Sequence, residues 1–139
     1  MTLDDLYSFA DEEGVFVSDF PLNKREAIST IDESGNCYIA IDPKKVRSRA
    51  DEKTKLAHEL GHCVTGAFYN VYSPYDIKRR QENRADVWAI KKLISEDELN
   101  AAVKKGYTEL WDLADYFNVN EPFMRKAISL YKFGNLYSV

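Results

Sequence analysis

The sequence contains only two histidines, His58 and His62, and their spacing constrains the fold more than any other feature. The apolar residues around them recur at helical spacing, which predicts a helix with one buried side: Leu56, Ala57, Leu60 and Val64. Residues four apart lie on the same helical face, with Cβ atoms roughly 5–6 Å apart. The two imidazoles can therefore bind one tetrahedral metal ion. Glu59 would lie beside that metal, where its carboxylate can accept a proton from water, the chemical sense of the H-E-x-x-H pattern.

A third ligand separates a metal site from a chance occurrence of this short motif. We expect the histidine helix to continue to about Tyr69 and a second helix to begin at Pro74. At 1.5 Å per residue, the stretches from His62 to Tyr69 and from Pro74 to Glu82 span roughly 10 and 12 Å. The second helix therefore places Glu82 beside the histidines of the first helix. Asp86 follows one turn later on the same face, and ligand histidines usually donate their second N–H to a carboxylate or carbonyl.

These positions predict a metal site with two histidines and a glutamate as ligands and an aspartate beside them: His58, His62, Glu82 and Asp86. This set leaves a fourth position for water, as in catalytic rather than structural zinc sites. Manganese is the alternative metal. The layout H-E-x-x-H-x-x-G-x-x-H is excluded, because Thr65 and Phe68 occupy the required glycine and histidine positions. Considered alone, the run 79–86 would be interpreted as a solvated helix face with surface ion pairs.

The rest of the chain predicts a single α+β domain. Its 139 residues include 45% apolar residues, enough to build a core. We expect a helix from Leu3 to about Gly14, then three short strands at 15–19, 26–32 and 37–42. Turn residues at 33–36 predict a hairpin in a small, mostly antiparallel sheet. Capping signals predict three further helices, ending near residues 106, 117 and 132.

Charge and cysteine usage narrow the function classes. A net charge of −4 argues against a dedicated nucleic-acid binder. Cys37 and Cys63 are too few for a disulfide framework, so we expect two free thiols in a reducing cytoplasm. Cys63 points about 100° away from His62 on the helix and is not expected to be a ligand. We find no apolar segment typical of a signal peptide or a membrane span, and we expect a cytoplasmic protein.

The segment 109–128 has the rhythm of a helix-turn-helix unit. Its second helix offers only Arg125 and Lys126 as a basic surface. We therefore favour packing or partner docking over DNA binding for these helices.

Substrate binding leaves alternatives open. An extended substrate could pair with a free edge of the strand that ends at Ile41, and a plain edge strand without such a role is the alternative. No donor for the oxyanion stands out. Tyr72 and Tyr75 lie between the two site helices, and we expect them to pack.

The segments 56–62 and 82–89, LAHELGH and ENRADVWA, resemble the corresponding helices of the ImmA/IrrE metallopeptidases. The strand hairpin before the motif and the helical C-terminus are also similar. The resemblance implies a zincin-like core over 1–94, with a helix-turn-helix-like unit over 95–139 packed on it. It also implies zinc ligands at His58, His62 and Glu82, a general base at Glu59, and Asp86 holding a histidine.

The same resemblance implies an anti-repressor of a prophage or mobile element, whose partner is a helix-turn-helix repressor. Two functions follow from it. The first is a zinc peptidase that cleaves the repressor, and the second is a zincin-fold regulator that inactivates the repressor by binding. The presence of Glu59 favours the peptidase, because a binding module has no need of a general base.

Overall fold

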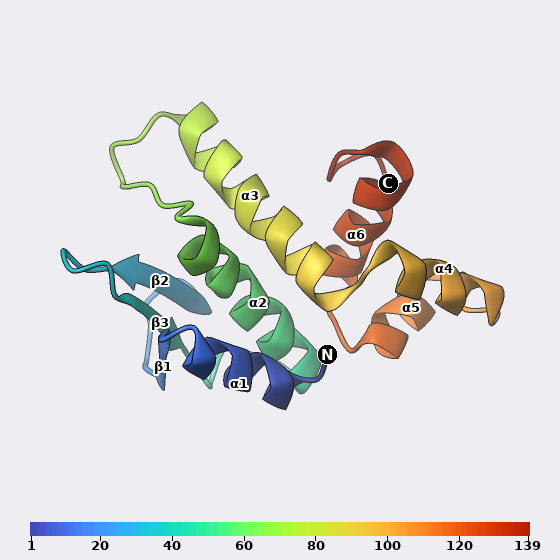
Figure 1. Cartoon of the computed structure of the whole chain (residues 1–139), viewed down its shortest axis with the longest axis horizontal. Helices are drawn as coiled ribbons and strands as arrows, with labels where there is room; N and C mark the ends of the chain where they lie inside the picture. The colour runs from blue at the N-terminus through green and yellow to red at the C-terminus, as the bar shows by residue number, and fades with distance from the viewer.

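A computed structural model describes all 139 residues and shows an α+β fold of six helices and a three-stranded sheet (Figure 1). The elements in chain order are α1 (Leu3–Glu12), β1 (Phe16–Asp19), β2 (Ala27–Ile31), β3 (Cys37–Ile41), α2 (Arg49–Thr65), α3 (Tyr75–Leu93), α4 (Glu96–Lys104), α5 (Leu110–Phe117) and α6 (Glu121–Phe133). None of the helices combines the length and the apolar character that crossing a bilayer requires.

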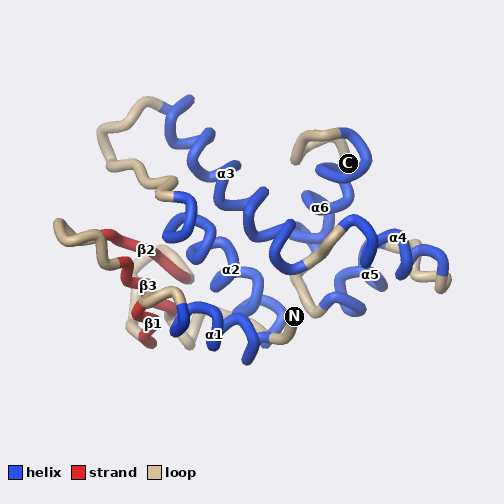
Figure 2. Tube along the Cα trace, viewed as in Figure 1, coloured by secondary structure: helices blue, strands red, loops and turns tan.

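Helices α2 and α3 run antiparallel through the middle of the molecule (Figure 2). Ser48 starts α2 by accepting a hydrogen bond from the backbone N–H of Asp51, as the capping signal predicts. The expected end of α2 near Tyr69 is wrong, because the helix stops at Thr65. Gly66 adopts the left-handed conformation (φ 69°) that terminates many helices.

The two site helices approach each other closely at Gly61. A Cβ atom at this position would lie 2.5 Å from the carbonyl oxygen of Ala85 and 2.9 Å from its Cα. Real Cβ atoms do not come this near to backbone atoms, so only glycine permits the observed distance between α2 and α3. Three neighbouring alanines are fully buried: Ala57, Ala85 and Ala89.

The sheet has the order β1-β3-β2 and is mixed. β2 and β3 form the predicted antiparallel hairpin, whereas β1 pairs with β3 in parallel. The segment between β1 and β2 is held against the end of β3, since Asp42 accepts a hydrogen bond from the N–H of Leu22. Because β3 pairs with a strand on each side, it is the central strand, and the expectation that its edge is free for a substrate is wrong. The free edges belong to β1 and β2.

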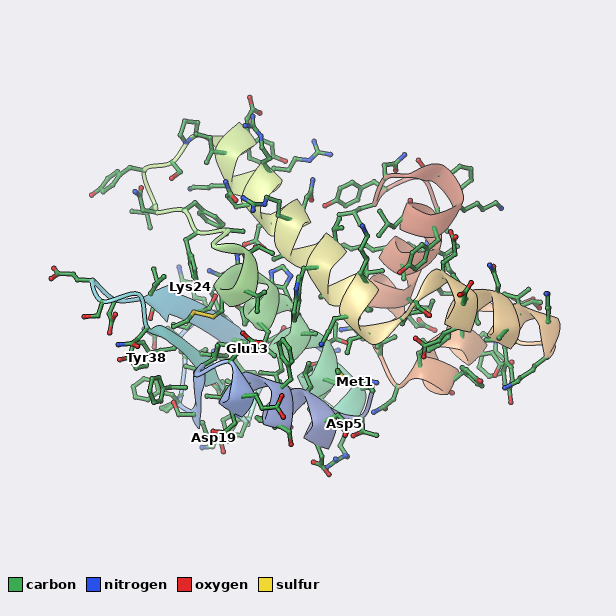
Figure 3. The ribbon with its side chains drawn as sticks, viewed as in Figure 1. Met1, Asp5, Glu13, Asp19, Lys24 and Tyr38 are labelled. Atoms are coloured by element: carbon green, nitrogen blue, oxygen red, sulfur yellow. A yellow bond between two sulfur atoms is a disulfide. The ribbon has the colours of Figure 1, made fainter.

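Cys37 and Cys63 form a disulfide, so the prediction of two free thiols is wrong (Figure 3). The bond joins the start of β3 to α2, one residue after His62. The sequence offered no indication of the pairing, because the two cysteines are 26 positions apart along the chain. The fold brings their Cα atoms to 5.9 Å, within the usual range for a disulfide.

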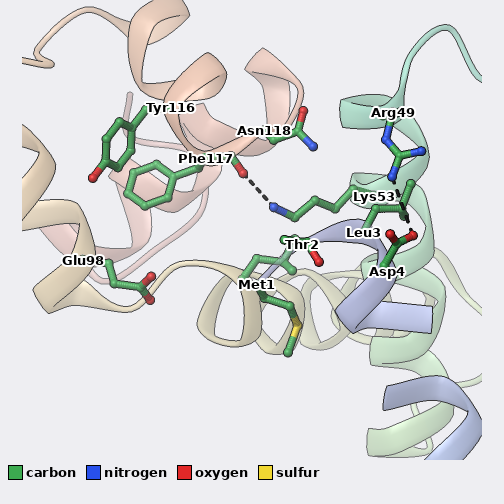
Figure 4. Close-up of a pocket in the computed structure, with 11 residues that line it drawn as sticks. Met1, Thr2, Leu3, Asp4, Arg49, Lys53, Glu98, Tyr116, Phe117 and Asn118 are labelled. Carbon is green, nitrogen blue, oxygen red and sulfur yellow. Dashed lines mark hydrogen bonds and ion pairs between the residues drawn. The ribbon is translucent and has the colours of Figure 1, made fainter. Parts of the chain in front are cut away.

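The turn between α5 and α6 is hydrogen-bonded to the start of α2. The Nζ of Lys53, which is only 4% exposed, donates to the carbonyl oxygen of Phe117 at the end of α5 (Figure 4). Asn120 caps α6 and also donates from its side chain to Asp51 and from its backbone to Thr54. These bonds fix the position of α6 relative to the site helices.

Candidate metal centre

The structure brings the three predicted ligand side chains together. One potential ligand atom from each of His58, His62 and Glu82 lies within 4.8 Å of the others. The Nε2 of His62 lies 3.2 Å from the Nε2 of His58 and 3.3 Å from Oε2 of Glu82. Tetrahedral zinc with bonds of about 2.05 Å holds its ligand atoms about 3.3 Å apart. The third distance, from His58 Nε2 to Glu82 Oε2, is shorter at 2.6 Å.

Both imidazoles are oriented through their other nitrogen. The Nδ1–H of His58 donates to Oδ1 of Asp86 over 2.8 Å, and that of His62 donates to the carbonyl oxygen of Ala67. Each ring therefore presents its Nε2 to the shared point. Donation of the second N–H to a carboxylate or carbonyl is the usual arrangement around a bound metal, so the residues present fit a metal ion.

The carboxylates around the point where the three ligand atoms converge favour a positive charge there. Burial lowers the pKa of His58, but the hydrogen bonds to Asp86 and Glu82 outweigh burial and raise it to about 10. Burial raises the pKa of Glu82, yet the hydrogen bonds from both histidines and Tyr69 hold it well below its usual range. Without a metal, a proton on His58 supplies this positive charge. A divalent cation would supply more positive charge and replace that proton.

Glu59 is buried beside the ligands, and Ser29 on β2 orients it. The Ser29 hydroxyl donates to Oε1 of Glu59 over 2.7 Å. Glu59, His62 and Glu82 line a small cavity of about 70 Å³, which has room for about two water molecules. The carboxylate thus has one oxygen fixed by β2 and lies beside a space in which a water molecule can react.

Two polar residues that the sequence analysis missed also line this cavity. The hydroxyl of Tyr69 donates to Oε1 of Glu82, and Nη2 of Arg25 lies 4.0 Å from the same oxygen. The expectation that Tyr72 and Tyr75 pack is wrong, because their exposed fractions are 92% and 72%. Tyr69 could have been considered from its position after the motif. Arg25 precedes β2, and no motif or spacing in the sequence indicates that it lies at the site.

A larger groove of about 570 Å³ opens beside the ligands and extends toward α6. Its walls carry cationic side chains from several elements: Lys24, Arg25, Lys55 and Lys126. Nζ of Lys126 lies 2.8 Å from Oδ2 of Asp86, so one of the two basic side chains available for DNA binding on the last helix is paired at this site. A cavity of similar size, about 590 Å³, lies between α1, α2 and α5 (Figure 4). That cavity contains no cluster of metal-binding side chains.

Two histidines on one helix, a glutamate ligand on the next and a buried glutamate beside them are typical of zincin-type metallopeptidases. Comparison with known families agrees with this class. The sequence model of Peptidase_M78, described as the IrrE N-terminal-like domain, matches residues 10–129, and the chain belongs to this ImmA/IrrE family. No curated protein matches the sequence.

Proposed function

We propose that this protein is a zinc-dependent peptidase that hydrolyses a peptide bond in a specific protein, a helix-turn-helix repressor. The observation that carries the proposal is the buried Glu59 beside three converging ligand atoms. Family membership supports a metallopeptidase. The repressor substrate comes from the resemblance alone, and it would place the reaction in the cytoplasm, where such repressors act.

His58, His62 and Glu82 would hold the zinc ion. Zinc supplies Lewis-acid activation of water and of the substrate carbonyl. Glu59 takes the proton of the attacking water at its carboxylate and delivers it to the leaving amine nitrogen. Ser29 keeps that carboxylate in place.

Arg25 and Tyr69 are the donors nearest to the ligands outside the motif. We assign them to the substrate carbonyl oxygen, which gains negative charge as the tetrahedral intermediate forms. In this role the Tyr69 hydroxyl would turn from Oε1 of Glu82 to that oxygen, and the exposed Arg25 side chain would close on it; donors that stabilise such an oxygen can contribute strongly to catalysis.

The free edge of β2 is the candidate surface for the substrate backbone. β2 carries Ser29, which contacts the general base, and its first residue, Ala27, lines the groove beside the ligands. An extended peptide that adds to this edge would place a peptide bond next to Glu59.

Replacement of Glu59 by glutamine tests the proposal. Glu59→Gln keeps the size of the side chain but cannot accept the proton. We expect zinc content to remain at about one ion per chain and cleavage of a candidate repressor to fall by about 10²–10⁴-fold. His62→Ala and Glu82→Ala should lose the metal. Repressor inactivation without cleavage, equally strong in Glu59→Gln, would instead establish the binding function.

A further inference from the structure

We infer that Lys126 is a positioning residue of the metal centre, holding Asp86 in the orientation that aligns His58. The C-terminal helical unit is then part of the site. This inference rests on the metal site proposed above.

Three contacts connect α6 to the ligands. Nζ of Lys126 lies 2.8 Å from Oδ2 of Asp86, and Oδ1 of the same carboxylate accepts from His58 Nδ1 at 2.8 Å. The opposite nitrogen of His58 faces Oε2 of Glu82 at 2.6 Å. Asp86 therefore stands between a cation on α6 and a ligand on α2, with one oxygen committed to each.

Burial makes the loss of this cation costly. The side chain of Asp86 is only 8% exposed, so water cannot replace a lost partner at low cost. The terminal torsion of an aspartate is broad, and one contact alone does not fix the plane of the carboxylate. With Lys126 on the second oxygen, the carboxylate is fixed from two sides, and the imidazole of His58 is fixed with it.

The position of Lys126 is itself determined by the fold. Asn120, at the start of α6, is bonded to Asp51 and Thr54 on α2. At the other end of the unit, the hydroxyl of Tyr137 donates to Asn83 on α3. Lys126 thus belongs to a helix that is attached to both site helices.

Zinc affinity measured by competition with a chromophoric chelator tests this role. We expect Lys126→Met to weaken zinc binding by about three- to tenfold. This is less than the ~10–100-fold typical for direct partners of ligands, because Lys126 acts one contact further away. Lys126→Arg, which keeps a cationic donor, should recover most of the affinity. Arg125→Met is the matched control, since Arg125 is the exposed neighbour on α6 and lines neither the cavity nor the groove at the site.

A double-mutant cycle separates positioning from general stability. Asp86→Asn weakens the acceptor through which Lys126 acts, so Lys126→Met should have little further effect on zinc affinity in that background. A purely structural role would lower the apo-protein Tm and zinc affinity equally in both backgrounds, and that result would overturn the inference. Unchanged zinc affinity in Lys126→Met would also overturn the inference about Lys126. The peptidase proposal would still stand in that case if Glu59→Gln loses cleavage. Conversely, if Lys126→Met weakens zinc binding but the wild-type protein cleaves no repressor, only the peptidase proposal is contradicted.

Discussion

At the scale of single residues, the site depends on hydrogen bonds that fix acids and imidazoles in place. Ser29 fixes Glu59, Ala67 fixes His62, and Asp86 fixes His58. None of the three partners needs to touch a metal or a substrate. Each of them determines the direction in which a reactive atom points.

Ser29→Ala removes the only hydroxyl that contacts the general base. We expect kcat to fall by about tenfold, equivalent to ~1.4 kcal/mol, because the carboxylate loses its fixed orientation. Zinc content and KM should change little. Steady-state kinetics on a cleaved substrate would measure this, with the exposed neighbour Thr30→Ala as control. An unchanged kcat in Ser29→Ala would show that Glu59 is oriented without β2.

The sequence alone predicts the members of the site that lie on α2 and α3. The spacing of His58, His62, Glu82 and Asp86 follows from helical periodicity and one reversal of the chain. Glu82 does lie near the two histidines, although the helix end assumed in the estimate was wrong. Arg25 and Lys126 could not be predicted, because each approaches the site from an element whose packing direction no local pattern encodes.

At the scale of elements, capping residues determine where helices begin, and sequence analysis located most of these starts. Ser48, Ser95 and Asn120 all cap the helices that follow them. The pairing of the strands was harder to predict from the sequence. The parallel pairing of β1 depends on how the segment 20–26 crosses to the far side of β3, and no turn signal specifies that path.

Gly61→Ala tests the close contact of α2 and α3. Alanine normally stabilises a helix interior by about 1 kcal/mol relative to glycine. Here the new methyl group would meet the backbone of Ala85, which cannot rotate away. We expect a net loss of about 3 kcal/mol in the free energy of unfolding and weaker zinc binding, since Glu82 and Asp86 move with α3.

Urea unfolding and chelator competition would measure these two effects. Val64→Ala, at an exposed position of the same helix, is the control. A Gly61→Ala protein more stable than the wild type would show that the two helices can separate without cost.

At the scale of the whole molecule, covalent and polar links join segments that are distant in sequence. The disulfide connects β3 to α2, and Lys53 connects α2 to the end of α5. Neither link could be expected from the sequence, because the pairing of two thiols or the burial of a lysine can be recognised only when the packing is known. The disulfide also removes the cysteine-based argument for a reducing compartment.

Removal of the disulfide should lower global stability. The two cysteines are 26 positions apart, for which the chain-entropy estimate is about 3.5 kcal/mol. We expect the double variant Cys37→Ala/Cys63→Ala to unfold at a lower urea concentration than the oxidised wild type. A thiol reductant should lower the wild-type midpoint and leave that of the variant unchanged. Titration of two free thiols in the unreduced native protein would contradict the bond.

The link between Lys126 and Asp86 also has a consequence in time. During synthesis, Lys126 is added 44 residues after Glu82 (126 minus 82). At about 5–20 residues per second, the ribosome needs roughly 2–9 seconds for this stretch. With the role inferred for Lys126, a nascent chain already has all three ligands during that interval but lacks the cation that fixes Asp86. A metal ion captured then would be held loosely and could still exchange, and its tight retention would begin only when α6 docks.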